Sequence, residues 1–206
     1  MTGLGRFYTN KNAIEVGIDE AGRGPLIGRV YVGAVILDPE MEDLHPYLND
    51  SKKITRKRRE VVREWIEENA SQFAVTYSDE KTIDKINILK ATHKAMHEAI
   101  DELGIIPDHI IVDGDKFPAY IDTEGEFVSH TCIVKGDSKF ASICAASVLA
   151  KEYHDQYIRE LVEQNPDLHE KYDLLNNMGY GTQNHINGIK KYGPSKFHRL
   201  SFNICK

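Results

Sequence analysis

The chain has 206 residues, of which 41% are hydrophobic, and its formal net charge is −6. Its length suits one domain, or one domain with a small appendage, because domains usually run to about 100–200 residues. The sequence lacks a run of roughly 20 apolar residues, a basic-then-apolar leader and a CxxC pair among its three cysteines, which excludes a membrane span, a secretory signal and a disulfide or zinc framework, so we expect a cytoplasmic protein.

Hydrophobic periodicity predicts strands and helices in mixed order along the chain. Strands are predicted at residues 13–18, 29–37, 72–77, 109–112 and 126–134. Helices are predicted at residues 55–69, 82–103, 138–163 and 184–192. A glycine-rich turn joins the first two strands and is short enough to make them antiparallel neighbours. The pattern as a whole predicts an α/β domain with a mixed β-sheet.

The most informative motif is DEAGRGP at residues 19–25, which follows the apolar residues of the first predicted strand. Adjacent carboxylates are hard oxygen ligands for Mg²⁺ or Mn²⁺, and they leave coordination positions open for a phosphate oxygen and water. The glycines allow the backbone to approach a bulky ligand, and Arg23 can pair with phosphate through its planar guanidinium. Acids, glycine and proline are also common in solvated turns, so local composition leaves that alternative open.

Two further aspartates lie at the edges of predicted elements. Asp113 follows a central strand, and Asp137 precedes the long helix predicted at 138–163. Each has a structural alternative, because Asp113 before glycine suits a turn and Asp137 could cap a helix. If folding brought both close to Asp19 and Glu20, the four carboxylates would repel one another unless a cation neutralised them. Convergence would therefore indicate a metal site, but sequence spacing leaves convergence open.

Basic residues are concentrated in two segments of an otherwise acidic chain. Residues 52–63 include seven basic residues and one acid, and residues 174–206 include five basic residues and no Asp or Glu. Such segments can supply a localised surface for the phosphates of a nucleic acid. A solvated helix face is the alternative explanation for the first segment.

Six motifs occur in order along the chain. They are DEAGRGP (19–25), DSKK (50–53), VDGDKFP (112–118), KGDSKFASICAASVLAK (135–151), GYGT (179–182), and GP followed by HRLSF (193–194 and 198–202). This series resembles ribonuclease HII, the type 2 ribonuclease H family, in its bacterial form. The resemblance implies a ribonuclease H-like fold, in which a central mixed sheet is flanked by helices. Residues 1–206 would form a single catalytic domain, whose basic C-terminal portion at about 174–206 contacts the substrate.

The resemblance also assigns roles to individual residues. The family's catalytic, metal-binding acids correspond to Asp19, Glu20, Asp113 and Asp137. Its GRG motif, its junction-sensing tyrosine and a segment near the substrate backbone correspond to Gly22, Arg23, Gly24, Tyr180, Ser51, Lys52 and Lys53. The chain departs from the family pattern at Arg29, where proline is common, and at His154, where arginine usually precedes Asp155.

The implied activity is hydrolysis of the RNA strand of RNA–DNA hybrids and incision 5′ of single ribonucleotides embedded in duplex DNA. The acids predict hydrolysis assisted by two Mg²⁺ or Mn²⁺ ions, which would activate water and stabilise the leaving 3′ oxygen, giving a 5′-phosphate and a 3′-hydroxyl. Selection of ribose would depend on the 2′-hydroxyl. We expect a monomer that binds hybrid and ribonucleotide-containing duplexes and no membrane.

Three alternatives are weighed against this interpretation. An enzyme of the ribonuclease HIII type would prefer long hybrid tracts, but the GRG motif with Tyr180 and the lack of an added N-terminal binding domain oppose it. A noncatalytic hybrid-binding protein would keep the fold, but all four acids are present. A phosphatase of small substrates would explain the acids and leave the basic segments without a purpose.

Overall fold

A computed structural model describes residues 3–41, 43–48 and 55–206 of the chain. Its centre is a six-stranded sheet in the order β3-β2-β1-β4-β6-β5. The strands are β1 (Glu15–Ala21), β2 (Val30–Leu37), β3 (Ala70–Ser78), β4 (His109–Asp113), β5 (Tyr120–Ile121) and β6 (Phe127–Ile133). Because β1 pairs antiparallel with β2 and parallel with β4, the predicted mixed sheet and the predicted first hairpin are confirmed.

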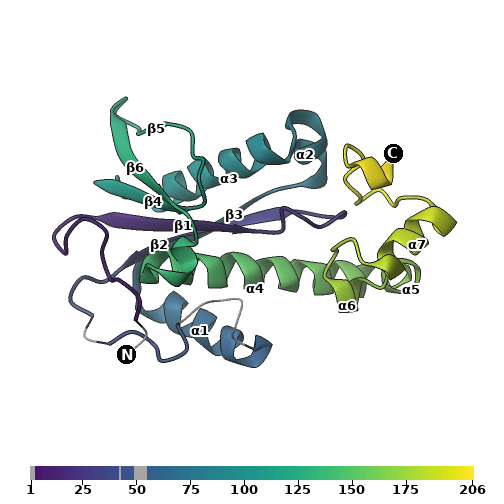
Figure 1. Ribbon diagram of the computed structural model, residues 1–206, viewed down its shortest axis with the longest axis horizontal. Coiled ribbons are helices and arrows are strands. Elements are labelled where there is room, and N and C mark those ends of the chain that lie inside the picture. The colour runs from purple at the N-terminus through teal and green to yellow at the C-terminus, as the bar shows by residue number, and fades with distance from the viewer. Residues whose placement is uncertain (1–2, 42, 49–54) are drawn as a thin grey trace.

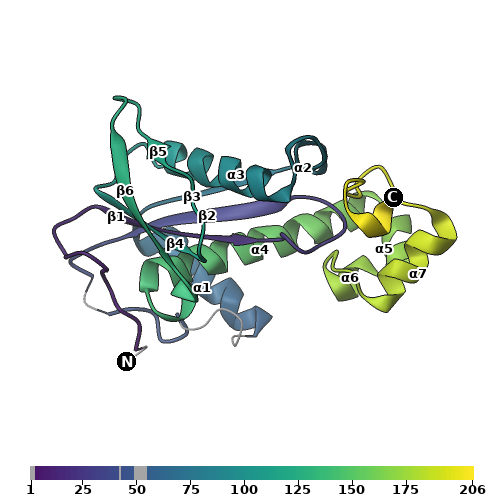
Figure 2. The same ribbon diagram turned by 45° about the horizontal axis from the view of Figure 1, so that its top comes forward.

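Helices cover both faces of the sheet. They are α1 (Arg56–Asn69), α2 (Glu80–Ile86), α3 (Ile88–Glu102), α4 (Ala141–Gln164), α5 (Asp167–Tyr172), α6 (Leu174–Asn177) and α7 (Gln183–Tyr192), with 3₁₀ turns η1 (Gly136–Ser138) and η2 (Asn203–Cys205). Figure 1 shows α2 and α3 on one side of the sheet and α4 with α1 on the other. In the rotated view of Figure 2, α5–α7 again gather at one end of the molecule. Within the described residues, none of the helices combines the length and the apolar character needed to cross a bilayer.

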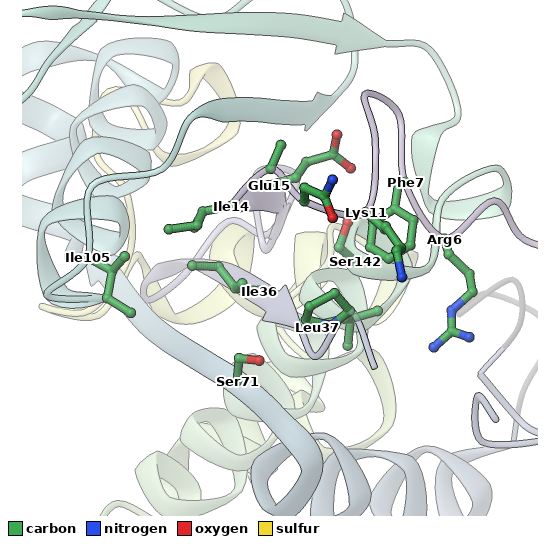
Figure 3. A pocket seen from close by; sticks show the side chains of 13 residues that line it. Arg6, Phe7, Lys11, Ile14, Glu15, Ile36, Leu37, Ser71, Ile105 and Ser142 are labelled. Carbon is green, nitrogen blue, oxygen red and sulfur yellow. The ribbon is translucent and has the colours of Figure 1, made fainter. Parts of the chain in front are cut away.

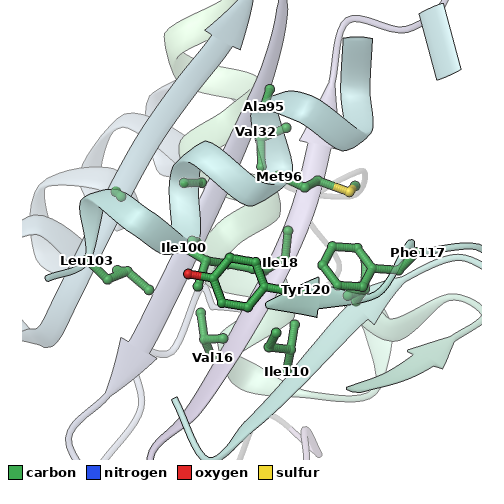
Figure 4. Packing of buried hydrophobic residues seen from close by; sticks show 14 of the residues in the cluster. Val16, Ile18, Val32, Ala95, Met96, Ile100, Leu103, Ile110, Phe117 and Tyr120 are labelled. Carbon is green, nitrogen blue, oxygen red and sulfur yellow. The ribbon is translucent and has the colours of Figure 1, made fainter. Parts of the chain in front are cut away.

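The face of the sheet that α3 covers carries the larger apolar core (Figure 4). Successive side chains of a strand point to opposite faces, so Val16 and Ile18 of β1 share this side and are fully buried. Met96 and Ile100 lie four residues apart on α3, which places them on the same face of the helix, towards the sheet. Ile110 of β4 completes the contact. Gly17 and Asp19, the alternate residues of β1, point to the other face of the sheet, which α4 covers.

Glycines let α4 lie very close to that second face. A Cβ atom at Gly17 would lie 2.3 Å from the backbone carbon of Ser142, and one at Gly33 would lie 2.4 Å from the carbonyl oxygen of Ala146. Ordinary contacts are about 3.5 Å or longer, so larger residues do not fit at this spacing. Gly33 pairs with Asp19 in the register of β1 and β2. The close approach of α4 is therefore centred beside Asp19.

The C-terminal helices are attached to the turn that follows β1. They share a buried cluster with that turn and with the second half of α4, which includes Leu26, Ile27, Ile158, Leu161, Leu168, Leu174 and Ile189. The backbone adds direct hydrogen bonds, from Leu26 N to Gly179 O at 2.8 Å and from Gly28 N to Phe197 O at 2.9 Å. The turn at residues 22–29 is thus held between the sheet and the C-terminal segment.

The prediction of one helix at 82–103 is wrong, because α2 and α3 are separated at Asn87. Asn87 has a positive φ of 68°, which ends α2, and its side chain accepts a hydrogen bond from Lys90 N, which caps α3. With a ψ of 162°, Asn87 lies outside the left-handed helical region, in a backbone region that is strained for any residue with a Cβ atom, and asparagine is at the same time a good N-cap. Pattern reasoning followed the apolar spacing, which continues across the break.

Two boundaries also differ from the prediction at positions that matter for the site. Strand β1 continues to Ala21, so Asp19 and Glu20 belong to the strand instead of following it. Asp137 lies in the separate turn η1, and Phe140 occupies the N-cap position of α4. The alternative in which Asp137 caps the long helix is therefore excluded.

Candidate active site

Three of the predicted acids lie at the ends of two neighbouring parallel strands. Asp19 and Glu20 are near the end of β1, and Asp113 ends β4. The parallel register pairs Ile18 with Val112, so Asp19 and Asp113 follow at adjacent positions. All three acids line a cavity of about 480 Å³, together with Arg23, Arg59, Ser147, Lys151 and Tyr180.

The surroundings of Asp19 oppose its ionisation. The residue is only 6% exposed, and burial, then the charges of Glu20 and Asp113, raise the pKa of its carboxyl well above the usual range. Hydrogen bonds from Ser147 of α4 and from the backbone N–H of Glu20, the latter at 2.7 Å, offset this only in part. Ser147 was not among the predicted site residues, although it lies inside the motif at 135–151.

Glu20 is paired with the arginine of the GRG motif. Arg23 Nη1 lies 3.1 Å from Glu20 Oε1, and 48% of the Arg23 side chain remains exposed. Burial raises the pKa of Glu20, and the neighbouring Arg23 guanidinium limits the rise. The ion pair keeps a guanidinium beside the carboxylates while leaving much of it accessible to an anion.

The fourth predicted acid, Asp137, is linked to this group through the backbone. It is 2% exposed in turn η1, and the N–H of the preceding residue, Gly136, donates to Asp113 Oδ1 at 2.6 Å. The turn that carries Asp137 is therefore attached to the end of β4. Its side chain is not among those that line the cavity, and its role as a metal ligand stays a prediction.

The chemistry of these side chains suits a divalent cation. Within the described ranges, no three His, Cys, Asp or Glu side chains are already closed around a position that could hold an ion. Asp19, Glu20 and Asp113 nevertheless face one cavity, where the charge of Asp113 raises the pKa of both Asp19 and Glu20. Bound Mg²⁺ or Mn²⁺ would turn that repulsion into attraction, and carboxylate oxygens are the ligands both ions prefer.

The GRG motif and Tyr180 line the same cavity and touch each other. Gly22 and Gly24 line it with Arg23 and Tyr180. A Cβ atom at Gly24 would lie 3.2 Å from the Tyr180 ring, so ring and backbone are in direct contact. Lys151 Nζ lies 5.6 Å from the centre of the same ring. The 40% exposure of Tyr180 leaves its ring available to a ligand.

Charged and polar side chains around Asp155 of α4 form hydrogen bonds and ion pairs next to Gly22 of the GRG motif. Asp155 accepts hydrogen bonds from Lys151 at 2.7 Å, from His154 at 3.1 Å and from Arg59 at 3.2 Å. Burial opposes ionisation of Asp155, but its bonds to His154 and Lys151 outweigh burial and lower its pKa. His154, one of the two departures from the family pattern, is thus a partner of Asp155 and packs against Gly22.

The basic segments contribute fewer free cations than their charge suggests. Arg59 also forms an ion pair with Glu152, and Arg63 pairs with Glu67. In the C-terminal segment Arg199 is 0% exposed, so its inclusion in a basic substrate-facing surface is wrong. The predicted substrate contacts at Ser51, Lys52 and Lys53 lie outside the described residues.

A second cavity, of about 180 Å³, lies at the other end of β1 and β2 (Figure 3). Its walls include apolar side chains such as Ile14, Ile36 and Leu37. Among the described residues that line it, the one carboxylate, Glu15, already accepts hydrogen bonds from the backbone of Tyr8 at 2.9 Å and of Thr9 at 2.9 Å. With that carboxylate occupied by the N-terminal loop, this cavity lacks the converging charges of the first.

Comparison with known proteins shows which family and which fold this chain is similar to. The family model for Ribonuclease HII matches residues 16–205. Ribonuclease HII of Bacteroides thetaiotaomicron is 45% identical over 197 residues, which cover 96% of this chain and 93% of the relative. Among solved structures, the ribonuclease H2 of Pyrococcus horikoshii superposes with a TM-score of 0.73 at 24% identity, covering 93% of this chain and 94% of the other. Bst-RNase HIII in complex with Mn²⁺ superposes with a TM-score of 0.64 at 21% identity, covering 93% and 67%.

Proposed function

The chain belongs to the ribonuclease HII family, and we propose that it hydrolyses the RNA strand of RNA–DNA hybrids and incises 5′ of ribonucleotides embedded in duplex DNA. The observation that carries this proposal is the convergence of Asp19, Glu20 and Asp113 on one cavity that the GRG turn and Tyr180 also line. Carboxylates suit a cation-assisted phosphodiester cleavage, and the GRG turn with Tyr180 suits a sugar.

The acids would hold two divalent cations, which would supply a water of lowered pKa and stabilise charge on the leaving 3′ oxygen. Asp19 and Asp113 are fixed by the paired strands β1 and β4, so the oxygen ligands are held by a rigid scaffold. We assign Asp137 to the same group, because its turn is bonded to Asp113. Arg23 would meet a phosphate oxygen through the exposed part of its guanidinium.

Ribose would be selected at the contact between the two glycine turns. A 2′-hydroxyl can donate and accept hydrogen bonds, which deoxyribose cannot do at that position. Gly22 and Gly24 expose backbone groups at close range, and the Tyr180 ring offers a flat surface with a hydroxyl for the sugar. Recognition of sugar and phosphate carries no base information, so we expect cleavage that depends on structure and not on sequence.

We further propose that residues 1–206 act as one catalytic unit, as a monomer in the cytoplasm. The bonds between the turn at 22–29 and the C-terminal segment support one unit, because they place Tyr180 from residues 174–206 in the cavity of the sheet. All three cysteines are free, which suits a reducing compartment.

The decisive experiment compares three matched duplexes: all-DNA, DNA with one embedded ribonucleotide, and an RNA–DNA hybrid. Incision of the second and third with Mg²⁺ or Mn²⁺, and none with chelator, is expected. Asp19→Asn and Asp113→Asn should abolish cleavage, while Asp43→Asn, a change at an exposed aspartate outside the cavity, should not. Activity on long hybrids without incision at the single ribonucleotide would favour the ribonuclease HIII type, and full activity of Asp113→Asn would refute the metal assignment.

A further inference from the structure

The buried arginine of the HRLSF motif holds the turn that contains the GRG motif. Arg199 is fully buried, and in the described part of the chain its guanidinium makes all its hydrogen bonds to carbonyl oxygens instead of carboxylates. These carbonyls, at 2.7–3.1 Å, belong to Gly22, Arg23, Pro25, Gly28 and Arg29. One side chain therefore holds the backbone at five positions between residues 22 and 29, and it is not among the residues that line the cavity.

The preceding residue, His198, is the start of a hydrogen-bonded chain that reaches Tyr180. His198 Nδ1 faces the backbone N–H of Ser195 at 2.9 Å, its Nε2 lies 3.0 Å from His185 Nε2, and His185 Nδ1 lies 3.0 Å from the carbonyl oxygen of Tyr180. Both histidines are buried. The GYGT turn is thus connected to the HRLSF motif through two rings.

The hydrogen-bond partners at the two ends of this series, Ser195 N–H and the Tyr180 carbonyl, determine the tautomer of each histidine ring. A backbone N–H can only donate, so His198 Nδ1 is the acceptor and the proton of neutral His198 is on Nε2. His198 then donates to His185 Nε2, which leaves the His185 proton on Nδ1, where the Tyr180 carbonyl accepts it. The pKa of both rings is lowered by burial, that of His198 to about 4, so both are neutral near pH 7.

The same short segment is also part of the backbone pairing at the cavity wall. Ile27 and His198 form an isolated antiparallel bridge, and Arg199 N donates to Leu26 O at 2.9 Å. The ring of Tyr180 rests against Gly24, so a shift of either turn changes the gap between them. Misplacement of about 1 Å at a reacting site can cost ~100-fold in rate.

We propose that His198 and Arg199 are positioning residues that hold the two walls of the ribose pocket, the turn at 22–29 and Tyr180, in fixed register. This inference deepens the proposed function and rests on it. Neither residue touches the substrate in this arrangement, since both act through the backbone of residues that line the cavity. The dipeptide would thereby set how strongly the enzyme prefers a single embedded ribonucleotide over a long hybrid.

The preference would depend on the number of positions along the duplex at which each substrate can place a ribose in the pocket. A single ribonucleotide must meet the pocket in one position, whereas a hybrid presents a ribose at every step. Arg199→Lys retains the charge but replaces a five-donor fork by one ammonium. We compare kcat/KM for the single-ribonucleotide duplex with kcat/KM for the hybrid, and we expect the ratio of the two to fall ~10-fold or more in Arg199→Lys, mainly through kcat. The affinity of the variant for duplex, measured in chelator, should stay within about threefold of wild type because phosphate contacts dominate binding.

Two substitutions of His198 test the hydrogen bonds between His198, His185 and Tyr180, and they are expected to differ in the size of their effect. His198→Gln keeps a donor that can reach His185, whereas His198→Asn keeps only an acceptor for Ser195 N, so Gln should preserve more of the ratio than Asn. Tyr120→Phe is the matched control, because it removes the hydroxyl of a buried tyrosine that donates to Asp101 at 2.7 Å and does not line the cavity, and it should lower thermal stability without changing the ratio. If Arg199→Lys does not fold, the two His198 variants carry the test.

Nitrogen-15 NMR of the histidine rings gives a readout that does not depend on activity. We expect a proton on Nε2 of His198 and on Nδ1 of His185. The same tautomer on both rings, or variants that are destabilised but keep the wild-type ratio as Tyr120→Phe does, would overturn the positioning role while leaving the proposed function intact. A wild-type enzyme that fails to incise the single-ribonucleotide duplex would instead overturn the function on which the inference rests.

Discussion

The close packing of α4 against the sheet can be tested by adding one methyl group. In Gly33→Ala the new Cβ would lie 2.4 Å from the carbonyl oxygen of Ala146, whereas ordinary contacts are about 3.5 Å. Helix and strand must therefore separate by about 1 Å. The obstacle is backbone, which cannot rotate away, so we expect the upper end of the usual overpacking cost, about 3 kcal/mol.

For a chain of this length that loss corresponds to a fall in Tm of roughly 6–12 °C. The displacement should also reduce activity, because Gly33 pairs with Asp19 and Ala146 precedes Ser147, whose hydroxyl bonds Asp19. Scanning calorimetry and the single-ribonucleotide incision assay, run well below the Tm of the variant, measure the two effects. We expect kcat to fall by ~10–100-fold, as misplacement of a reacting group by about 1 Å allows.

Gly104→Ala is the matched control. Gly104 has a φ of +66° and an added Cβ would meet nothing within 4 Å, so the substitution costs about 1–2 kcal/mol of backbone strain without moving α4. It should lower the Tm and leave kcat unchanged. An unchanged Tm in Gly33→Ala would show that α4 does not lie at this distance, and a lowered Tm with full kcat would show that the close approach does not position Ser147.

Three further outcomes are expected. In chelator at neutral pH, Asp19→Asn should raise the Tm. The pKa of Asp19 is raised in the folded protein, so the ionised carboxyl destabilises the fold increasingly as pH rises above its unfolded pKa of about 3.9. A lower Tm in the variant would contradict this reasoning. Burial and then the neighbouring His185 lower the pKa of His198 to about 4, so the unfolded chain binds an extra proton as pH falls from about 6.5 to 4. Urea denaturation should therefore show a loss of stability over that pH range, and the loss should be smaller in His198→Gln. Equal losses in the two proteins would refute this explanation. Asn87→Ala should destabilise by about 1 kcal/mol through the lost cap, whereas Asn87→Gly should cost less because glycine adopts this backbone region without strain; calorimetry that ranks them the other way would exclude this explanation.

Local pattern was sufficient for most of the fold. Alternating apolar residues identified β1, β2, β4 and β6, and their order indicated the mixed sheet that the structure contains. The break at Asn87 was missed because apolar spacing continues through it, while a single side chain both ends α2 and caps α3. The two-residue strand β5 was also missed, since so short a segment has no period to detect.

For the site, the motifs identified the residue types and their chemistry, because carboxylates, glycines and a tyrosine have the same reactivity wherever they lie. The tertiary structure decided which of them meet. It placed Asp19 beside Asp113 through the parallel pairing of β1 with β4, and it brought Ser147 to Asp19 through the contact at Gly33. It also buried Arg199, which sequence counting had assigned to a basic surface. Residue type follows from the chain alone, but burial and neighbourhood depend on contacts between segments far apart in sequence, and only packing determines those.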